Sequence, residues 1–449
     1  MGVPRRAAWH WMWIAPTGYC LLLQAASIGN DAFVAPFALA AIFFALRARE
    51  SGRARDLFCS ILSAALMTAI KATSLPLLLP WAIAILPSLK IFLQRPIATA
   101  MVCVLAVFSS FLPTAVLNSR FCGDWSGRVM EGDLPHGNLL VRLGVNTLFI
   151  AVSNLVPPIF PEANKWNAFV LRHTPARLRH RIQESFNTQP QPYELQVVEM
   201  QMEENAGFGF GCTLLLAASA IGAAASCRRR FFRFEFRSLD GLFQVGLVLS
   251  PWVATLALLS QAAVNDLARM IAPFYLLLPP LVLRSPCHEQ LVKKTWWLTA
   301  AFFLFALAAG LLIISPARPL FPVSALLAKL QAGGSNSKLA TRIEDVYSAY
   351  QDRNHAFAPA LAVLPPQTRI LGLISYDDPE ASLWQPFGSR RIICLKPTDT
   401  SAWLKSRGVQ YVLARSTAFG DRFPPFDAWK KRMNAVVIRE IPLAIRART

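Results

Sequence analysis

The stretch SIGNDAFV at residues 27–34 holds the carboxylate of Asp31 between two segments that are apolar enough for a lipid bilayer. A charged side chain next to hydrocarbon is costly unless it faces water or a charged partner. A carboxylate in such a place can act as a general base on a hydroxyl or orient a sugar, and nearby Lys or Arg side chains can bind a phosphate. The alternative is structural, because Asn30 and Asp31 are residue types that favour the N-cap of a helix starting at Ala32.

The composition indicates a polytopic membrane protein. Hydrophobic residues make up 54% of the 449 residues, charged residues only 16%, and the mean hydropathy is +0.39, which no ordinary soluble domain combines. The net charge of +19 could suggest a nucleic-acid partner. However, the arginines lie mostly in short loops between apolar runs, where they orient helices and contact anionic lipid headgroups. The predicted partners are therefore membrane lipids, and no nucleic acid.

The apolar runs and the basic loops predict nine spans with a cytoplasmic N-terminus. The runs RARESGRAR at 47–55 and CRRRFFRFEFR at 227–237 are the strongest cytoplasmic signals. Several spans are shorter than the ~20 residues of a perpendicular helix, so broken helices are expected. The predicted spans are 9–26, 33–46, 57–70, 73–87, 97–117, 207–226, 242–259, 270–283 and 296–315.

Residues 118–206 are predicted to form a large extracytoplasmic loop. Within it, residues 139–156 are apolar enough to resemble a tenth span, but Arg142, Asn146, Ser153 and Asn154 recur near helical spacing. These polar residues would gather on one face, which favours a helix lying in the membrane interface.

The C-terminal part, residues 316–449, is predicted to be a small extracytoplasmic α/β domain. The segments TRILGLI, RIICLK and QYVLA have the composition of short buried strands, and SAWLKSRGV that of a helix between the last two. Neither a phosphate-binding Gly loop nor a nucleophile elbow is present. The eight cysteines have no metal-ligand spacing, so no cofactor is predicted and the need for a divalent cation is left open.

This topology brings ionisable and amide side chains from distant parts of the chain to the outer membrane surface around Asp31. A carboxylate among cations at such a surface suits chemistry on a lipid-linked phosphate. The side chains that share this face are Lys71, Arg120, Asp124, Glu131, Asp133, Asn265, Asp266 and Arg269.

Three blocks of the chain resemble the GT-C membrane glycosyltransferases that use polyprenyl-phosphate sugars, such as protein O-mannosyltransferases and lipid A aminoarabinose transferases. The blocks are AASIGNDAFVAPFALAAIFFALRARESGR, LSAALMTAIKATSLPLLLP and NDLARMIAPFYLLLPPLVL. The resemblance implies a mainly α, GT-C-type transmembrane bundle in residues 1–315. It also implies that Asp31 is the acidic residue of an extracytoplasmic active site, and that Lys71 and Arg269, with Asn30 and Asn265, bind substrate and phosphate.

The expected function is glycosyl transfer from a polyprenyl-phosphate sugar to an acceptor hydroxyl of a glycan, lipid or protein outside the cytoplasm. The family also carries an Asp-Glu or Asp-Asp pair in its first outer loop, and this chain has no such pair near its start. The chain is therefore expected to begin two or three spans late, through a misplaced start, a truncation or a second polypeptide. The alternative function is a noncatalytic membrane scaffold or accessory subunit whose outer domain binds a partner.

Overall fold

The chain divides into two compact units, Met1–Phe321 and Pro322–Thr449, a few residues after the predicted boundary at Ser315. The computed structural model describes residues 1–25, 30–127, 138–186, 197–203, 205–226, 238–262, 267–316, 318–332, 341–347, 357–375, 380–419 and 425–441.

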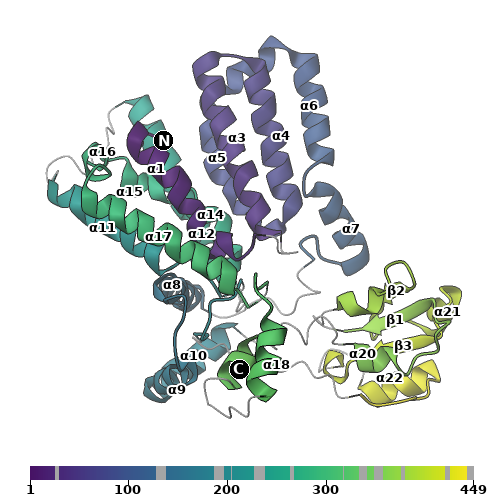
Figure 1. Ribbon diagram of the computed structural model, residues 1–449. Helices are drawn as coiled ribbons and strands as arrows, with labels where there is room; N and C mark the ends of the chain where they lie inside the picture. Colours follow the sequence, from purple (N-terminus) through teal and green to yellow (C-terminus); the bar gives the residue numbers. More distant parts are fainter. Residues whose placement is uncertain are drawn as a thin grey trace. The chain divides into compact units, whose positions relative to one another are not determined.

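Unit 1 is helical, and four of its described helices are long and apolar enough to cross a membrane. A fifth candidate is a bent pair with an angle of 41° between its halves. These candidates coincide with five predicted spans, so the chain has the character of a membrane protein (Figure 1). They are α3 (Asp31–Ser51), the run 72–94 formed by η2 (Ala72–Leu77), α5 (Leu78–Ile85) and η3 (Leu86–Gln94), α12 (Leu239–Gln261), α17 (Thr295–Ile314), and the pair α6 (Pro96–Phe108) and α7 (Leu112–Cys122).

The other four predicted spans coincide with helices that are shorter or interrupted. Proline explains the interruptions, because it lacks a backbone N–H and disfavours helix in the residue before it. The elements are α1 (Arg5–Ile14), η1 (Ala15–Thr17) and α2 (Tyr19–Leu22); α4 (Ala54–Ile70); α11 (Phe210–Ser226); and α13 (Leu267–Met270), α14 (Ala272–Tyr275) and α15 (Pro279–Leu283), followed by α16 (His288–Leu291). Pro16 lies between α1 and α2, Pro273 is the second residue of α14, and Pro279 is the first residue of α15.

Helices α3 and α4 form a closely packed antiparallel hairpin (Figure 1). Ala38, Ala41, Ala45 and Ala48 recur along one face of α3 and are buried. Small side chains at this spacing let two helix backbones approach each other. Ser60 on α4 uses the short distance to donate a 2.7 Å hydrogen bond to the carbonyl of Ala41. The hairpin therefore fixes the start of α3 next to the end of α4.

Helix α8 (Leu139–Leu155) buries both polar and apolar residues and exposes several leucines. The polar residues Asn146 and Ser153 are buried, whereas Leu140, Leu148 and Leu155 are 75%, 51% and 49% exposed. An apolar exposed stripe suits contact with lipid. Helices α9 (Ala163–His173) and α10 (Ala176–Phe186) follow, and α10 packs on α8.

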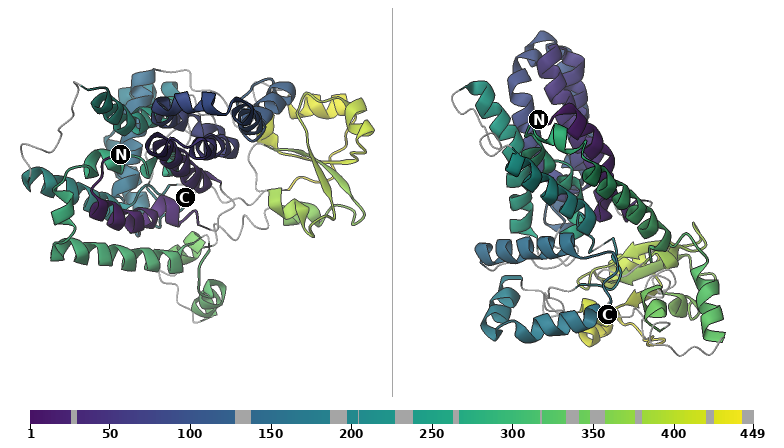
Figure 2. Two further views of the ribbon diagram at one scale, coloured as in Figure 1. Left: turned by 90° about the horizontal axis from the view of Figure 1, so that it is seen from above. Right: turned by 60° about the vertical axis from the view of Figure 1, so that its left-hand side comes forward.

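Unit 2 contains a three-stranded parallel sheet in the order β2-β1-β3 (Figure 2). The strands lie within the three predicted segments. Apolar clusters cover the sheet, one with Phe357 beside Leu373 and the other with Trp429 beside Ile374. The elements are β1 (Ile370–Ile374), β2 (Arg391–Cys394), β3 (Tyr411–Ala414), α18 (Val323–Ala332), α20 (Ala358–Leu361), η5 (Glu380–Trp384), α21 (Ser401–Ser406), η6 (Ser416–Ala418) and α22 (Phe426–Met433).

Candidate functional site

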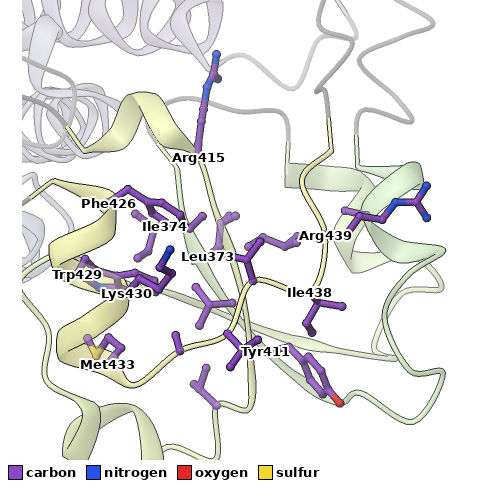
Figure 3. Close-up of a pocket in the computed structure, with 18 of the residues that line it drawn as sticks. Leu373, Ile374, Tyr411, Arg415, Phe426, Trp429, Lys430, Met433, Ile438 and Arg439 are labelled. Carbon is purple, nitrogen blue, oxygen red and sulfur yellow. The ribbon is translucent and has the colours of Figure 1, made fainter.

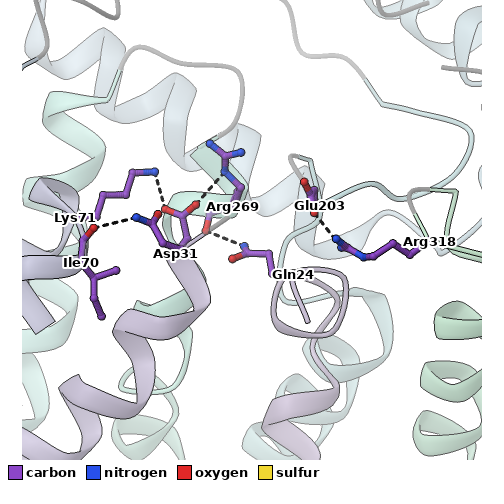
Figure 4. Close-up of polar contacts among 8 residues, drawn as sticks. Gln24, Asp31, Ile70, Lys71, Glu203, Arg269 and Arg318 are labelled. Carbon is purple, nitrogen blue, oxygen red and sulfur yellow. Dashed lines mark hydrogen bonds and ion pairs between the residues drawn. The ribbon is translucent and has the colours of Figure 1, made fainter. Parts of the chain in front are cut away.

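Asp31 lies at the centre of a three-residue ion cluster in unit 1 (Figure 4). Lys71 Nζ is 2.7 Å from Oδ1 of Asp31, and Arg269 Nε is 3.0 Å from Oδ2. The carboxylate side chain is only 3% exposed, but the lysine and arginine side chains are 22% and 23% exposed. The three residues come from three distant segments, as the predicted convergence requires.

The hairpin of α3 and α4 positions the first two members of this cluster. Asp31 is the first residue of α3, where the helix dipole favours a negative charge. Asn30 is the N-cap residue, but its side chain makes no capping hydrogen bond. Its Nδ2 instead donates to the carbonyl of Ile70 at 2.9 Å, which ties α3 to the end of α4. The simple capping role considered for Asn30 is therefore not the one observed.

Lys71 adopts an extended backbone conformation directly after α4. Ser74 holds this turn, because its hydroxyl donates to the carbonyls of Met67 at 2.9 Å and Lys71 at 2.7 Å. Ser74 is buried. Sequence reasoning missed it, and the only available signal is a serine four residues after the helix end.

Arg269 belongs to the short helix α13, where its neighbours Leu267 and Ala268 are fully buried. Gln24 Nε2 donates to the carbonyl of Arg269 at 3.3 Å. The residues just after α2 therefore also hold α13 in place. The predicted substrate-binding residue Asn265 lies outside the described residues.

Two asparagines of α8 hold the chain before and after Arg269. Asn146 Nδ2 donates to the carbonyls of Leu259 at 2.7 Å and Ala262 at 3.0 Å, at the end of α12. Asn154 Oδ1 accepts a 2.6 Å bond from the hydroxyl of Tyr275 in α14. The predicted polar face of α8 exists, but at these positions it faces backbone and side chains of the protein. It braces the segment that delivers Arg269.

A second ion pair adjoins this region. Arg318 Nη2 lies 3.1 Å from Oε2 of Glu203 and donates to the carbonyl of Leu23 at 2.7 Å. Leu23 directly precedes Gln24, whose side chain contacts the carbonyl of Arg269 (Figure 4), so two consecutive residues connect this pair to Arg269. Neither Glu203 nor Arg318 was a predicted site residue.

The remaining predicted polar residues have other surroundings or are not described. Arg120 lies over the ring of Phe121, and Asp124 accepts a hydrogen bond from the hydroxyl of Ser126. Among the residues that the structure describes, no group of three or more His, Cys, Asp or Glu side chains could hold a metal ion. Those that lie outside the described residues are Glu131, Asp133, Asn265 and Asp266.

Unit 2 carries an open cavity of about 1410 Å³ between β3, α22 and residues 435–441 (Figure 3). Leu373, Trp429 and Ile438 contribute apolar lining, and Arg415 and Lys430 are also among the lining residues. None of the predicted site residues lines it. We therefore assign the candidate chemistry to the ion cluster of unit 1.

The cluster combines one buried carboxylate with two partly exposed cations and so carries one net positive charge. Such an arrangement can bind an anion through the cations while the carboxylate fixes their positions. The fold and site thus define a helical protein with the character of a membrane protein and a carboxylate–lysine–arginine cluster. Comparison with protein-family models, curated proteins and solved structures gives no match.

Proposed function

We propose that this protein transfers a glycosyl group from a polyprenyl-phosphate-linked sugar to an acceptor hydroxyl on the extracytoplasmic face of the membrane. The observation that carries the proposal is the contact of both Lys71 and Arg269 with the two oxygens of Asp31. These are the residues that the resemblance to GT-C glycosyltransferases singles out. Both cations are partly exposed, and Lys and Arg side chains are residue types that bind phosphate.

The proposed topology has nine spans, a cytoplasmic N-terminus and an extracytoplasmic unit 2. Residues that contact one carboxylate must lie at one membrane depth, which supports a common side for Lys71 and Arg269. The basic run 47–55 lies at the opposite end of the α3–α4 hairpin from Asp31, as the positive-inside rule requires if Asp31 is outside.

In the proposed reaction, the acceptor oxygen attacks the anomeric carbon with inversion, and the bond from that carbon to the phosphate oxygen breaks. Lys71 and Arg269 bind the phosphate and stabilise the negative charge that the leaving group gains. Asp31 holds the two cations and orients the sugar, with Asn30 and Asn265 as further substrate contacts. No cofactor is proposed. The exposed leucines of α8 border the entrance for the lipid.

The alternative is a noncatalytic scaffold or accessory subunit of the membrane. One observation favours this alternative. The ion cluster joins α3, the end of α4 and α13, and in a noncatalytic protein its role would be to stabilise the packing of these helices. In that case unit 2, with its apolar cavity, would bind the partner.

Donor consumption in membranes of the native host, where the acceptor is present, tests the proposal. Asp31→Asn and Arg269→Ala should abolish release of polyprenyl phosphate from a labelled donor, without reducing the amount of protein in the membrane. The matched control is Asp240→Asn, because Asp240 is an exposed carboxylate that also pairs with an arginine, Arg49. Unchanged turnover in both cluster variants would refute the assignment and favour the accessory role.

A further inference from the structure

Both carboxylate oxygens of Asp31 are occupied by cations, at 2.7 Å and 3.0 Å. A general base needs a lone pair directed at the hydroxyl whose proton it removes. The Asp31 side chain is only 3% exposed and both of its oxygens face cations, so an acceptor hydroxyl has little access to it. The proposed displacement therefore calls for a second carboxylate near the first.

Glu203 meets this requirement. Its side chain is 16% exposed, compared with 3% for Asp31, so a substrate hydroxyl can reach it. Its ion pair with Arg318 uses Oε2 at 3.1 Å, and a carboxylate held through one oxygen can accept a proton on the other.

The backbone connects Glu203 to the ion cluster through short steps. Arg318 donates to the carbonyl of Leu23. The next residue, Gln24, donates to the carbonyl of Arg269, as Figure 4 shows. Leu23 also packs in one apolar cluster with Ala206, three residues after Glu203. Leu23 contacts the Glu203–Arg318 pair and Gln24 contacts the ion cluster, so both are anchored to two consecutive residues directly after α2.

We infer that Glu203 is the general base for the acceptor and that Arg318 is its positioning residue, an inference that rests on the proposed function. The Glu203 carboxylate takes the proton of the acceptor hydroxyl as the oxygen forms its bond to the anomeric carbon. The bond between that carbon and the phosphate oxygen breaks, and its electron pair leaves with the polyprenyl phosphate at Lys71 and Arg269. The proton then passes from Glu203 to water.

The test compares Glu203→Gln and Glu203→Asp in the full chain, with Glu184→Gln as the control because Glu184 is exposed on α10. Two quantities are measured: donor turnover in native-host membranes as a function of pH, and binding of polyprenyl phosphate to the purified protein. Glu203→Gln should lower turnover about 100-fold or more and remove the decline of turnover at low pH. Polyprenyl phosphate affinity should change less than about twofold, and Glu203→Asp should restore part of the turnover.

Two results would overturn this inference alone: wild-type turnover in Glu203→Gln, or a parallel loss of turnover and of polyprenyl phosphate binding, which would make Glu203 structural. If the wild-type protein neither binds polyprenyl phosphate nor consumes donor, the proposed function fails and this inference with it.

Discussion

Lys71 and Asp31 form a 2.7 Å ion pair that joins the residue after α4 to the first residue of α3. The pair lies at the open end of a helical hairpin, and Arg269 completes it from a third segment. The same three side chains therefore serve the proposed phosphate site and hold three segments of unit 1 together. Stability measurements test the second role and lipid binding tests the first.

Replacing Asp31 with Ala should destabilise unit 1 more than replacing Lys71 with Gln. The first change leaves two cations facing each other without their shared partner, whereas the second leaves Asp31 paired with Arg269. Thermal unfolding of the full chain in detergent measures the difference. An equal or smaller decrease in melting temperature for Asp31→Ala would show that the cations do not depend on the carboxylate.

Asn146→Ala should destabilise the protein by roughly 1–3 kcal/mol, because the buried carbonyls of Leu259 and Ala262 lose their shared donor. Thr147→Ala is the control on the same helix, since Thr147 is exposed. Thermal unfolding again supplies the measurement. If both variants unfold at the same temperature, α8 does not brace the segment before Arg269.

Gly372→Ala should destabilise unit 2 by roughly 1–3 kcal/mol through overpacking. A Cβ at this position in β1 would lie 2.5 Å from Cδ1 of Leu395 and 2.9 Å from Cγ1 of Val409. Gly310→Ala serves as the comparison, because nothing lies within 4 Å of a Cβ there and Ala favours the helix. Limited proteolysis of the full chain should show faster cleavage within unit 2 only for Gly372→Ala, and equal resistance of the two variants would be inconsistent with this packing.

Cys394 should react slowly with iodoacetamide at pH 8. Burial raises the pKa of the Cys394 thiol, and the charge of Glu380 raises it further. A raised pKa lowers the thiolate fraction at a given pH, and the thiolate is the reactive species. In a variant whose only cysteine is Cys394, Glu380→Gln should increase the alkylation rate and move its pH dependence to lower pH. A rate that does not respond to this substitution would show that Glu380 does not affect the thiol.

Sequence patterns predicted the parts of the fold that depend on local composition. The three β segments of unit 2 are recognisable as short apolar runs bounded by turn residues. The segments of α3, α12 and α17 are recognisable as long apolar runs next to basic residues. The convergence of Asp31, Lys71 and Arg269 followed from alternating the sides of successive spans. It needed no knowledge of side-chain contacts.

Other features depend on tertiary contacts that no local pattern encodes. The polar stripe of α8 has the same spacing whether it faces headgroups or, as Asn146 does, the end of another helix. Ser74 and Gln24 act through backbone carbonyls of residues that only the fold brings near. The Arg318–Glu203 pair joins residues 115 positions apart in the chain, so its partners could not be matched from their positions.

Binding of polyprenyl phosphate to the purified full chain, followed by native mass spectrometry, tests the central claim most directly. Wild-type protein should bind the lipid, and Lys71→Gln and Arg269→Gln should each weaken binding about tenfold or more, because each removes one charge-assisted contact to phosphate. Lys90→Gln, at an exposed lysine in η3, should bind as the wild type does. Equal affinity of the wild-type protein and all three variants would contradict a phosphate site at Asp31, Lys71 and Arg269.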